Sequence, residues 1–579
     1  MIRFLLIAVP FLLCNIARGQ SSDRKSEDLT NFVFEDALVV LTIDDLSALT
    51  KSIQSHELFS QLTEQTKSTD PFSILLNWLS AKVYVGLHRN QAIEKSGFSR
   101  EEVSDAFTGQ LVFAVYPDLD GLSFSIIADS DGNDIVFERV VDFSLKRTLG
   151  LQSLQWKEES YQNRLLQTCV IGPGDLKVGI VAVNGKILIG SHLDRLCQLA
   201  SCVERSTKLD TCLSRHPDWV DLRKSEVLES SPCLLSLFAR PSALYKYFGS
   251  QQRNAFGEFF TARNFLQHCC ESIAIRLTQP DSSKSKREFE VGIRTKIHEE
   301  TQLRESITGI FKHQLELKDL MVVAPEDAIS ASFVFDSAES FGQLLAEVTL
   351  APNGFGTTLM MKNIQKSNPL PIQNRFVWIQ NADGSTCAQI PVTNRDEADQ
   401  WLKKKVQSTV LNSPLLSAKF KESTTAFHQS RNIAIPKPAD ELSNSRGTFF
   451  NLQGNPGGFY GAVGRVDSNI LYSSSVDKFL NDKVEADDSL LDAPGFQFVL
   501  DECKSLSSAT DRIVMIHYFD MPSWIENASK REKRTSQLSS DEFWEKANAV
   551  LIQETGPIGV LVTKTHVGIA IDLFMVRRR

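Results

Sequence analysis

Three aspartates lie close behind apolar runs, where catalytic acids often stand at the ends of strands: Asp45, Asp336 and Asp520. Acids placed in this way could supply general acid–base catalysis. Each also precedes a segment with helical character, and a carboxylate there accepts hydrogen bonds from the free N–H groups of the first helical turn. We therefore predict that these aspartates cap helices and have no part in catalysis.

Two short segments contain residue types that bind metal ions. The run from Asp129 to Asp134 offers oxygen ligands at alternate positions, but a calcium-binding loop needs Gly at its sixth position and Glu at its twelfth. Asp134 and Val140 stand there, so a hairpin turn explains the run better. The His-Cys-Cys sequence at 268–270 lacks the CxxC spacing of a zinc site. We predict no metal ligand.

Motifs for nucleophilic catalysis or phosphate binding are not convincing. The glycine-rich segment 454–464 lacks the GxxxxGK[ST] pattern and precedes a hairpin, whereas a phosphate cradle needs a following helix. We find no convincing GxSxG, HExxH or SxxK motif. His517 lies in an apolar run that favours a hydrogen-bonded strand histidine, and His192 follows a predicted capping serine. The sequence therefore predicts no catalytic residue, no cofactor-binding residue and no cofactor.

The cysteines leave two alternatives open. An odd number, nine, follows the N-terminal leader, so at least one cannot pair within the chain. Export would permit disulfides, and Cys197, Cys202 and Cys212 form the cluster most suited to one. The other alternative is a set of unpaired, mostly buried thiols. The nine are Cys169, Cys197, Cys202, Cys212, Cys233, Cys269, Cys270, Cys387 and Cys503.

The elements that must position these residues occur twice, at a separation of about 285 residues, the period of the internal repeat. In chain order, the repeated pieces are 35–38 and 326–329, 183–196 and 466–479, and 273–278 and 558–563. The first pair is separated by 291 residues, the second by 283 and the third by 285. Because the order is preserved, we interpret the chain as two copies of one large unit.

Hairpins alternate with capped helices in both halves. Strand pairs are predicted at 111–116 with 122–128, 273–277 with 289–297, 375–379 with 386–392, and 558–562 with 567–574. Asn184-Gly185 suits a tight turn between strands, and Ser191 with Asp194 suits a capping box at a helix start. This alternation predicts an α+β fold, in which each copy has mostly antiparallel sheets with helices packed on one face.

The predicted domain boundaries follow from the repeat. Residues 1–19 are a signal peptide, 20–298 the first α+β half, 299–320 a connecting helix and 321–579 the second half. The connecting helix is indicated by one apolar face containing Leu303, Ile307 and Ile310. We predict a loop at 528–540, because that segment contains a short run of charged residues.

The N-terminus is typical of an export signal, with Arg3 before an apolar run at 4–13 and small residues before a predicted cut after Gly19. Loss of the two leader arginines, Arg3 and Arg18, takes the net charge from −9 to −11. Such an acidic chain disfavours nucleic-acid binding. We expect a secreted or periplasmic protein with no membrane span after cleavage, since no other apolar run approaches roughly 20 residues.

The leader, the acid-led strand and the VNGKILIGS hairpin with its helix, all repeated, resemble large exported proteins of unassigned function from planctomycete-type bacteria. The resemblance implies duplicated α+β units in an envelope or exported protein and supplies no catalytic residue. We expect a non-enzymatic binding or scaffolding protein with an unknown envelope or extracellular partner. A hydrolase with a motif-free active site and a carrier of an apolar ligand are the alternatives.

Overall fold

The structure is a computed structural model that describes part of the chain. The chain divides into two compact units. Unit 1 comprises residues 1–255, 266–297 and 540–554, and unit 2 comprises 256–265, 298–539 and 555–579. The described residues are 28–44, 109–119, 121–129, 155–171, 176–223, 233–247, 270–278, 287–298, 328–334, 376–382, 385–392, 394–400, 441–444, 447–451, 462–466, 469–473, 490, 493–506, 512–535, 542–565 and 568–576. The predicted signal peptide and connecting helix lie outside them.

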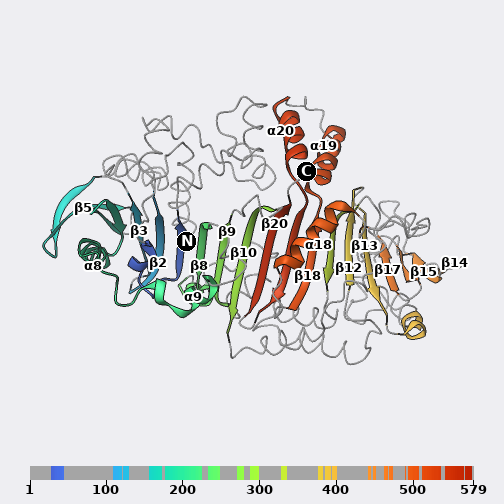
Figure 1. The fold of residues 1–579 in the computed structure, drawn as a ribbon, viewed down its shortest axis with the longest axis horizontal. Coiled ribbons are helices and arrows are strands. Elements are labelled where there is room, and N and C mark those ends of the chain that lie inside the picture. Colours follow the sequence, from blue (N-terminus) through green and yellow to red (C-terminus); the bar gives the residue numbers. More distant parts are fainter. Residues whose placement is uncertain are drawn as a thin grey trace, which may run out of the picture. The chain divides into compact units, whose positions relative to one another are not determined.

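Unit 1 contains an antiparallel sheet of ten strands (Figure 1). In spatial order the strands are β4-β5-β6-β7-β3-β2-β1-β8-β9-β10. Their bounds are β1 Val39–Ile43, β2 Leu111–Asp118, β3 Gly121–Asp129, β4 Lys157–Tyr161, β5 Arg164–Ile171, β6 Leu176–Val183, β7 Lys186–Gly190, β8 Cys233–Ala239, β9 Cys270–Thr278 and β10 Arg287–Ile297. The helical segments are η1 Leu29–Phe32, α8 Leu193–Glu204, η2 Leu213–Arg215, α9 Pro217–Arg223, α10 Pro241–Tyr245 and α20 Glu542–Glu554.

Unit 2 contains ten described antiparallel strands in the order β14-β15-β16-β17-β13-β12-β11-β18-β19-β20. Their bounds are β11 Ala328–Val334, β12 Phe376–Asn381, β13 Thr386–Pro391, β14 Glu441–Asn444, β15 Gly447–Asn451, β16 Ala462–Val466, β17 Asn469–Ser473, β18 Arg512–Phe519, β19 Ile558–Lys564 and β20 Ile569–Val576. The described helices of unit 2 include α18 Pro494–Leu506 and α19 Met521–Thr535.

The two units share one strand order. Each strand of unit 2 occupies the position that the strand numbered ten lower occupies in unit 1. Helices follow the same scheme, since α9 and α18 precede β8 and β18, and α10 and α19 follow them. Two copies of one unit would have this topology, and the duplication inferred from the sequence stays a prediction.

The predicted α+β class is wrong. Extended antiparallel sheet is the dominant structure of the described residues, and helices are the minor component. The predicted hairpins are present, but they join edge to edge into continuous ladders, for example through the pairing of β1 with both β2 and β8. The residue patterns that predict a hairpin are local, so they do not predict which hairpins pair with one another.

Each strand in the middle of unit 1 contributes to two apolar layers, because successive side chains point to opposite faces of a sheet. One layer contains Leu41, Phe113 and Ile126. The other contains Val40 and Val112 together with the buried side of α8. Strands buried on both faces appear in sequence as continuous apolar runs.

Glycines allow α8 to approach the sheet closely. A Cβ atom on Gly179 of β6 would lie 2.8 Å from both Leu193 Cδ2 and Leu196 Cδ2 of the helix. Gly190 of β7 also lies under Leu196, whose Cβ would be 3.6 Å from an added Cβ. Gly179 therefore needs a residue without a side chain, whereas a methyl group at position 190 would make ordinary van der Waals contacts.

Local predictions had mixed outcomes. The four predicted hairpins are confirmed, and Asn184 and Gly185 have φ of 49° and 70° in the turn between β6 and β7. The loop predicted at 528–540 is wrong over 528–535, because α19 continues to Thr535, and residues 536–540 lie outside the described residues. Lys, Arg and Glu are good helix formers, so the charged run continues the helix.

Candidate functional site

Asp520 caps a helix as predicted. Its Oδ1 accepts a hydrogen bond from the N–H of Ser523 at 3.1 Å, and its Oδ2 accepts one from the Ser523 hydroxyl at 2.9 Å. The carbonyl of Asp520 accepts the first bond of α19, from Trp524 N. Both carboxylate oxygens are thus used by the scaffold. The equivalent predictions for Asp45 and Asp336 lie outside the described residues.

The capping box predicted for Ser191 and Asp194 is wrong. The hydroxyl of Ser191 accepts a hydrogen bond from Phe124 N of β3 at 2.9 Å. The helix α8 begins one residue later, with His192 as its cap. Asp194 accepts hydrogen bonds from Tyr161 and Gln162 at 2.8 and 2.6 Å. The serine hydroxyl is therefore used by a strand of the sheet, a contact that the local sequence pattern does not contain.

His517 of β18 is a hydrogen-bonded strand histidine, as predicted. Its Nδ1 lies 2.8 Å from the hydroxyl of Ser332 on the neighbouring strand β11. Burial lowers the pKa of His517. Of the run from Asp129 to Asp134, only Asp129 is described, and it forms an ion pair with Lys186 at 3.4 Å. Most of the glycine-rich segment 454–464 also lies outside the described residues.

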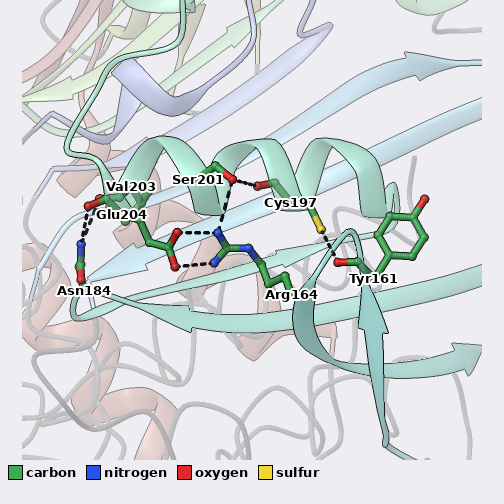
Figure 2. Close-up of polar contacts among 7 residues, drawn as sticks. All are labelled: Tyr161, Arg164, Asn184, Cys197, Ser201, Val203 and Glu204. Atoms are coloured by element: carbon green, nitrogen blue, oxygen red, sulfur yellow. Dashed lines mark hydrogen bonds and ion pairs between the residues drawn. The ribbon is translucent and has the colours of Figure 1, made fainter.

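A polar seam joins α8 to β5, and Figure 2 shows its contacts. Arg164 donates two hydrogen bonds to the carboxylate of Glu204, at 2.8 and 2.6 Å, and a third to Ser201 at 3.4 Å. The Cys197 thiol lies 3.8 Å from the carbonyl of Tyr161. Because each polar group is used between helix and strand, the seam fixes α8 on the sheet.

The hairpin turn between β6 and β7 caps the other end of α8. The side-chain amide of Asn184 donates to the carbonyls of Val203 and Glu204 at 3.2 and 3.3 Å (Figure 2). These are carbonyls of the last helical turn, and that of Val203 also accepts from the N–H of Ser206 at 3.1 Å. Asn184 thus has two roles, in the turn and in the helix cap.

A group of interacting ionisable side chains lies at one end of the unit 1 sheet. We call it the charged cluster, and its members are His216, Asp218, Arg240, Glu271 and Lys296. Lys296 at the end of β10 donates to Asp218 Oδ1 at 2.7 Å and lies 3.3 Å from Glu271 Oε2. Asp218, in the first turn of α9, is buried. The residues come from three elements, α9, β9 and β10, and from the segments before α9 and after β8.

Arg240 lies within the charged cluster, at the end of β8. Its guanidinium stands 5.6 Å from the centre of the Phe238 ring, and one of its nitrogens, Nη2, is buried without a hydrogen-bond partner. Burial lowers the pKa of Arg240. The negative charges of Asp218 and other nearby carboxylates act to raise this pKa but do not outweigh burial. The guanidinium is held by charge and ring contact more than by hydrogen bonds.

The pKa values of His216 and Lys296, two members of the charged cluster, are shifted in opposite directions. Burial lowers the pKa of His216, and Arg240 lowers it further, so the imidazole is neutral at pH 7. Burial alone would lower the pKa of Lys296. The hydrogen bonds and negative charges of Asp218 and Glu271 outweigh burial, so the pKa of this lysine is raised. Lys296 therefore keeps its proton at neutral pH, and His216 is a potential general base.

Three thiols of the described residues, those of Cys197, Cys202 and Cys503, are poor nucleophiles. None of the eight described cysteines forms a disulfide, which agrees with the second alternative for the cysteines. Burial raises the pKa of Cys197 and Cys202, and raises that of Cys503 to about 12. A thiol with a raised pKa holds its proton at neutral pH and is unreactive.

The charged cluster was missed in the sequence analysis, since its members are spread from residue 216 to residue 296 and follow no motif. The only local signal was the His-Pro-Asp sequence at 216–218. Within the described ranges, no group of three or more His, Cys, Asp or Glu side chains is placed to hold a metal ion. None of the described helices is long and apolar enough to cross a membrane.

Comparison with known proteins adds little to this description. No model of a known protein family matches the chain, and no curated protein does. The chain is similar to two crystal structures of TP0453. Form I has 11% sequence identity over 49% of this chain and 84% of that chain, with a TM-score of 0.24. Form IV has 11% identity over 46% and 81%, with a TM-score of 0.23. Similarity at this level supports no conclusion about fold or function.

Proposed function

We propose that this chain is an exported, non-enzymatic binding or scaffolding protein of the cell envelope. The leader sequence supports export, with cleavage after Gly19. The excess of acidic residues supports a partner other than nucleic acid. The partner belongs to the envelope or to the extracellular space.

One observation favours a non-enzymatic role above the rest: three reactive side chains of the described residues, those of Asp520, Lys296 and Cys503, are held by the scaffold in unreactive states. Asp520 uses both carboxylate oxygens in a helix cap, and Lys296 is held protonated between two carboxylates. The buried thiol of Cys503 also retains its proton. An enzyme that used these groups would need them free to transfer protons or attack a substrate.

The proposal is tested by isolating the mature protein from its native compartment after mild crosslinking. We expect a stoichiometric protein partner from the envelope, and an N-terminus at residue 20. A stoichiometric small molecule in place of a protein would contradict the scaffolding role. An uncleaved N-terminus in a cytoplasmic fraction would contradict export.

A hydrolase is the second candidate, because His216 is a neutral imidazole among fixed charges in the charged cluster. Such a histidine is suited to act as a general base if a substrate binds beside it. A panel of ester and peptide substrates would test this, with His216→Ala compared with His517→Ala. Turnover lost only in His216→Ala would favour the hydrolase, and no turnover by the wild type would favour scaffolding.

A further inference from the structure

Two helices of unit 1 begin with a histidine that acts as an acceptor. The carbonyl of His192 accepts the first bond of α8, from Leu196 N at 3.0 Å, and its Nδ1 accepts from Arg195 N at 3.4 Å. His216 repeats the arrangement in α9. Its carbonyl accepts from Val220 N at 3.0 Å, and its Nδ1 accepts from Asp218 N at 3.3 Å.

Capping by Nδ1 requires an unprotonated nitrogen. A neutral imidazole with its proton on Nε2 has one acceptor, Nδ1, whereas an imidazolium ion has none. Protonation would therefore replace a hydrogen bond with two N–H groups facing each other. It would also place a positive charge at the positive end of the helix dipole. Ser, Thr, Asn and Asp, the usual capping residues, do not lose their acceptor oxygen in this way near neutral pH.

We propose that His192 and His216 form a pH-sensitive device that releases the first turns of α8 and α9 when the surroundings become acidic. Each cap depends on the same atom, and the two helices pack on the same unit. Acidification acts on both together. The first turns loosen while the sheet beneath them stays intact.

The charged groups around His216 come from several elements. Arg240 after β8 and Lys296 on β10 oppose its protonation, and Asp218 on α9 and Glu35 before β1 favour it. Burial is the largest influence and, with the two cations, lowers the pKa of His216. The sign follows from linkage: the cap is complete above the imidazole pKa of the unfolded chain, about 6.5, and is lost as pH falls through the lower folded pKa of His216.

The charged groups near the start of α8 have a different arrangement. Asp194 and Arg195 belong to the helix itself. Asp36, before β1, binds Arg195 through both carboxylate oxygens, and Asp118 at the end of β2 also acts on that guanidinium. These groups differ from those around His216, so the two caps stand in different electrostatic surroundings.

The test replaces each histidine with asparagine, whose side-chain oxygen caps a helix and does not titrate. Amide hydrogen exchange of the full chain is measured at about pH 7.5 and about pH 5, on either side of the ordinary imidazole pKa. Rates are converted to protection factors to remove the intrinsic effect of pH. Peptides covering 193–204 and 217–223 report on the two helices, and a peptide from β8 reports on the sheet.

In the wild type, we expect roughly fivefold lower protection of both helix starts at the acidic pH, the size of effect that loss of one cap produces. His192→Asn should remove the pH effect in α8 alone, and His216→Asn in α9 alone. His517→Asn, in unit 2, serves as the control and should leave both effects in place.

Three results would overturn the proposal. Equal protection of the wild-type helices at both pH values would refute it without any variant, even if the substitutions impaired folding. Full pH dependence in the asparagine variants would assign the effect to other groups. Equal loss of protection in β8 would indicate general acid unfolding in place of a local release.

Discussion

Arg195 of α8 binds the carboxylate of Asp36, 159 residues earlier in the chain, through two hydrogen bonds of 2.9 and 2.7 Å. The same guanidinium lies 5.1 Å from the ring centre of Phe34 and 4.7 Å from that of Tyr116. A planar, forked cation suits both contacts at once. This single side chain joins the helix, the segment before β1 and strand β2.

Replacement of Arg195 with lysine should therefore destabilise unit 1 despite the unchanged charge. Lysine cannot make the paired bonds or stack on the rings, and we expect a loss of about 1 kcal/mol in the free energy of unfolding. Urea denaturation measures the change. Arg215→Lys, at an exposed position, is the matched control, and an equal effect in both variants would contradict the role assigned to Arg195.

Asn184→Gly should destabilise α8 while preserving the hairpin turn. Glycine accepts the positive φ of this position, but it removes the amide that caps Val203 and Glu204. A loss of about 1 kcal/mol is expected from one helix cap. Asn184→Asp should lower the stability more. Its carboxylate can only accept hydrogen bonds, and it would face the helix carbonyls and the carboxylate of Glu204. A higher thermal unfolding temperature for Asn184→Asp than for Asn184→Gly would disprove the capping role.

Asp520→Ala should lower the stability of unit 2 by about 1 kcal/mol through loss of the α19 cap. Asp520→Asn keeps an acceptor oxygen for the N–H of Ser523 and should lose much less. Chemical denaturation of the two variants compares them directly. A large loss of any measured partner binding at unchanged stability would instead assign Asp520 a functional role.

Gly559→Ala should destabilise unit 2, because an added Cβ would lie 2.4 Å from Phe574 Cζ and 2.8 Å from Val499 Cγ1. Overpacking of this kind costs about 2 kcal/mol. The double variant Gly559→Ala/Phe574→Leu makes room for the methyl group and should recover part of the loss relative to Phe574→Leu alone. Strictly additive effects would show that the two sites do not share the space.

Lys296 should contribute a pH-dependent stability at the alkaline end. Burial opposes its charge, but Asp218 and Glu271 raise its folded pKa, so the contribution is complete below the pKa of the unfolded lysine, about 10.4. It is lost as pH rises through the folded pKa. Lys296→Met should remove this alkaline dependence in denaturation curves measured from neutral pH upward. An unchanged dependence would assign it to another group.

Local sequence patterns determined the hairpins and several turns. The Asn184-Gly185 pair specifies its turn because both residues tolerate positive φ. Asp520 specifies a helix start because its carboxylate reaches N–H groups only a few residues away. Interactions of this range depend on the neighbouring residues alone, so a pattern of residue types is sufficient to predict them.

Tertiary structure decided the rest. It joined the hairpins into one ten-strand order in each unit, and that made sheet dominant where an α+β fold was predicted. It moved the α8 cap from Ser191 to His192, because the serine hydroxyl binds a strand 67 residues away in sequence. It also assembled the charged cluster, in which Asp218 and Lys296 are 78 residues apart. Contacts over such separations depend on which strands pair, and that is settled by packing of the whole sheet.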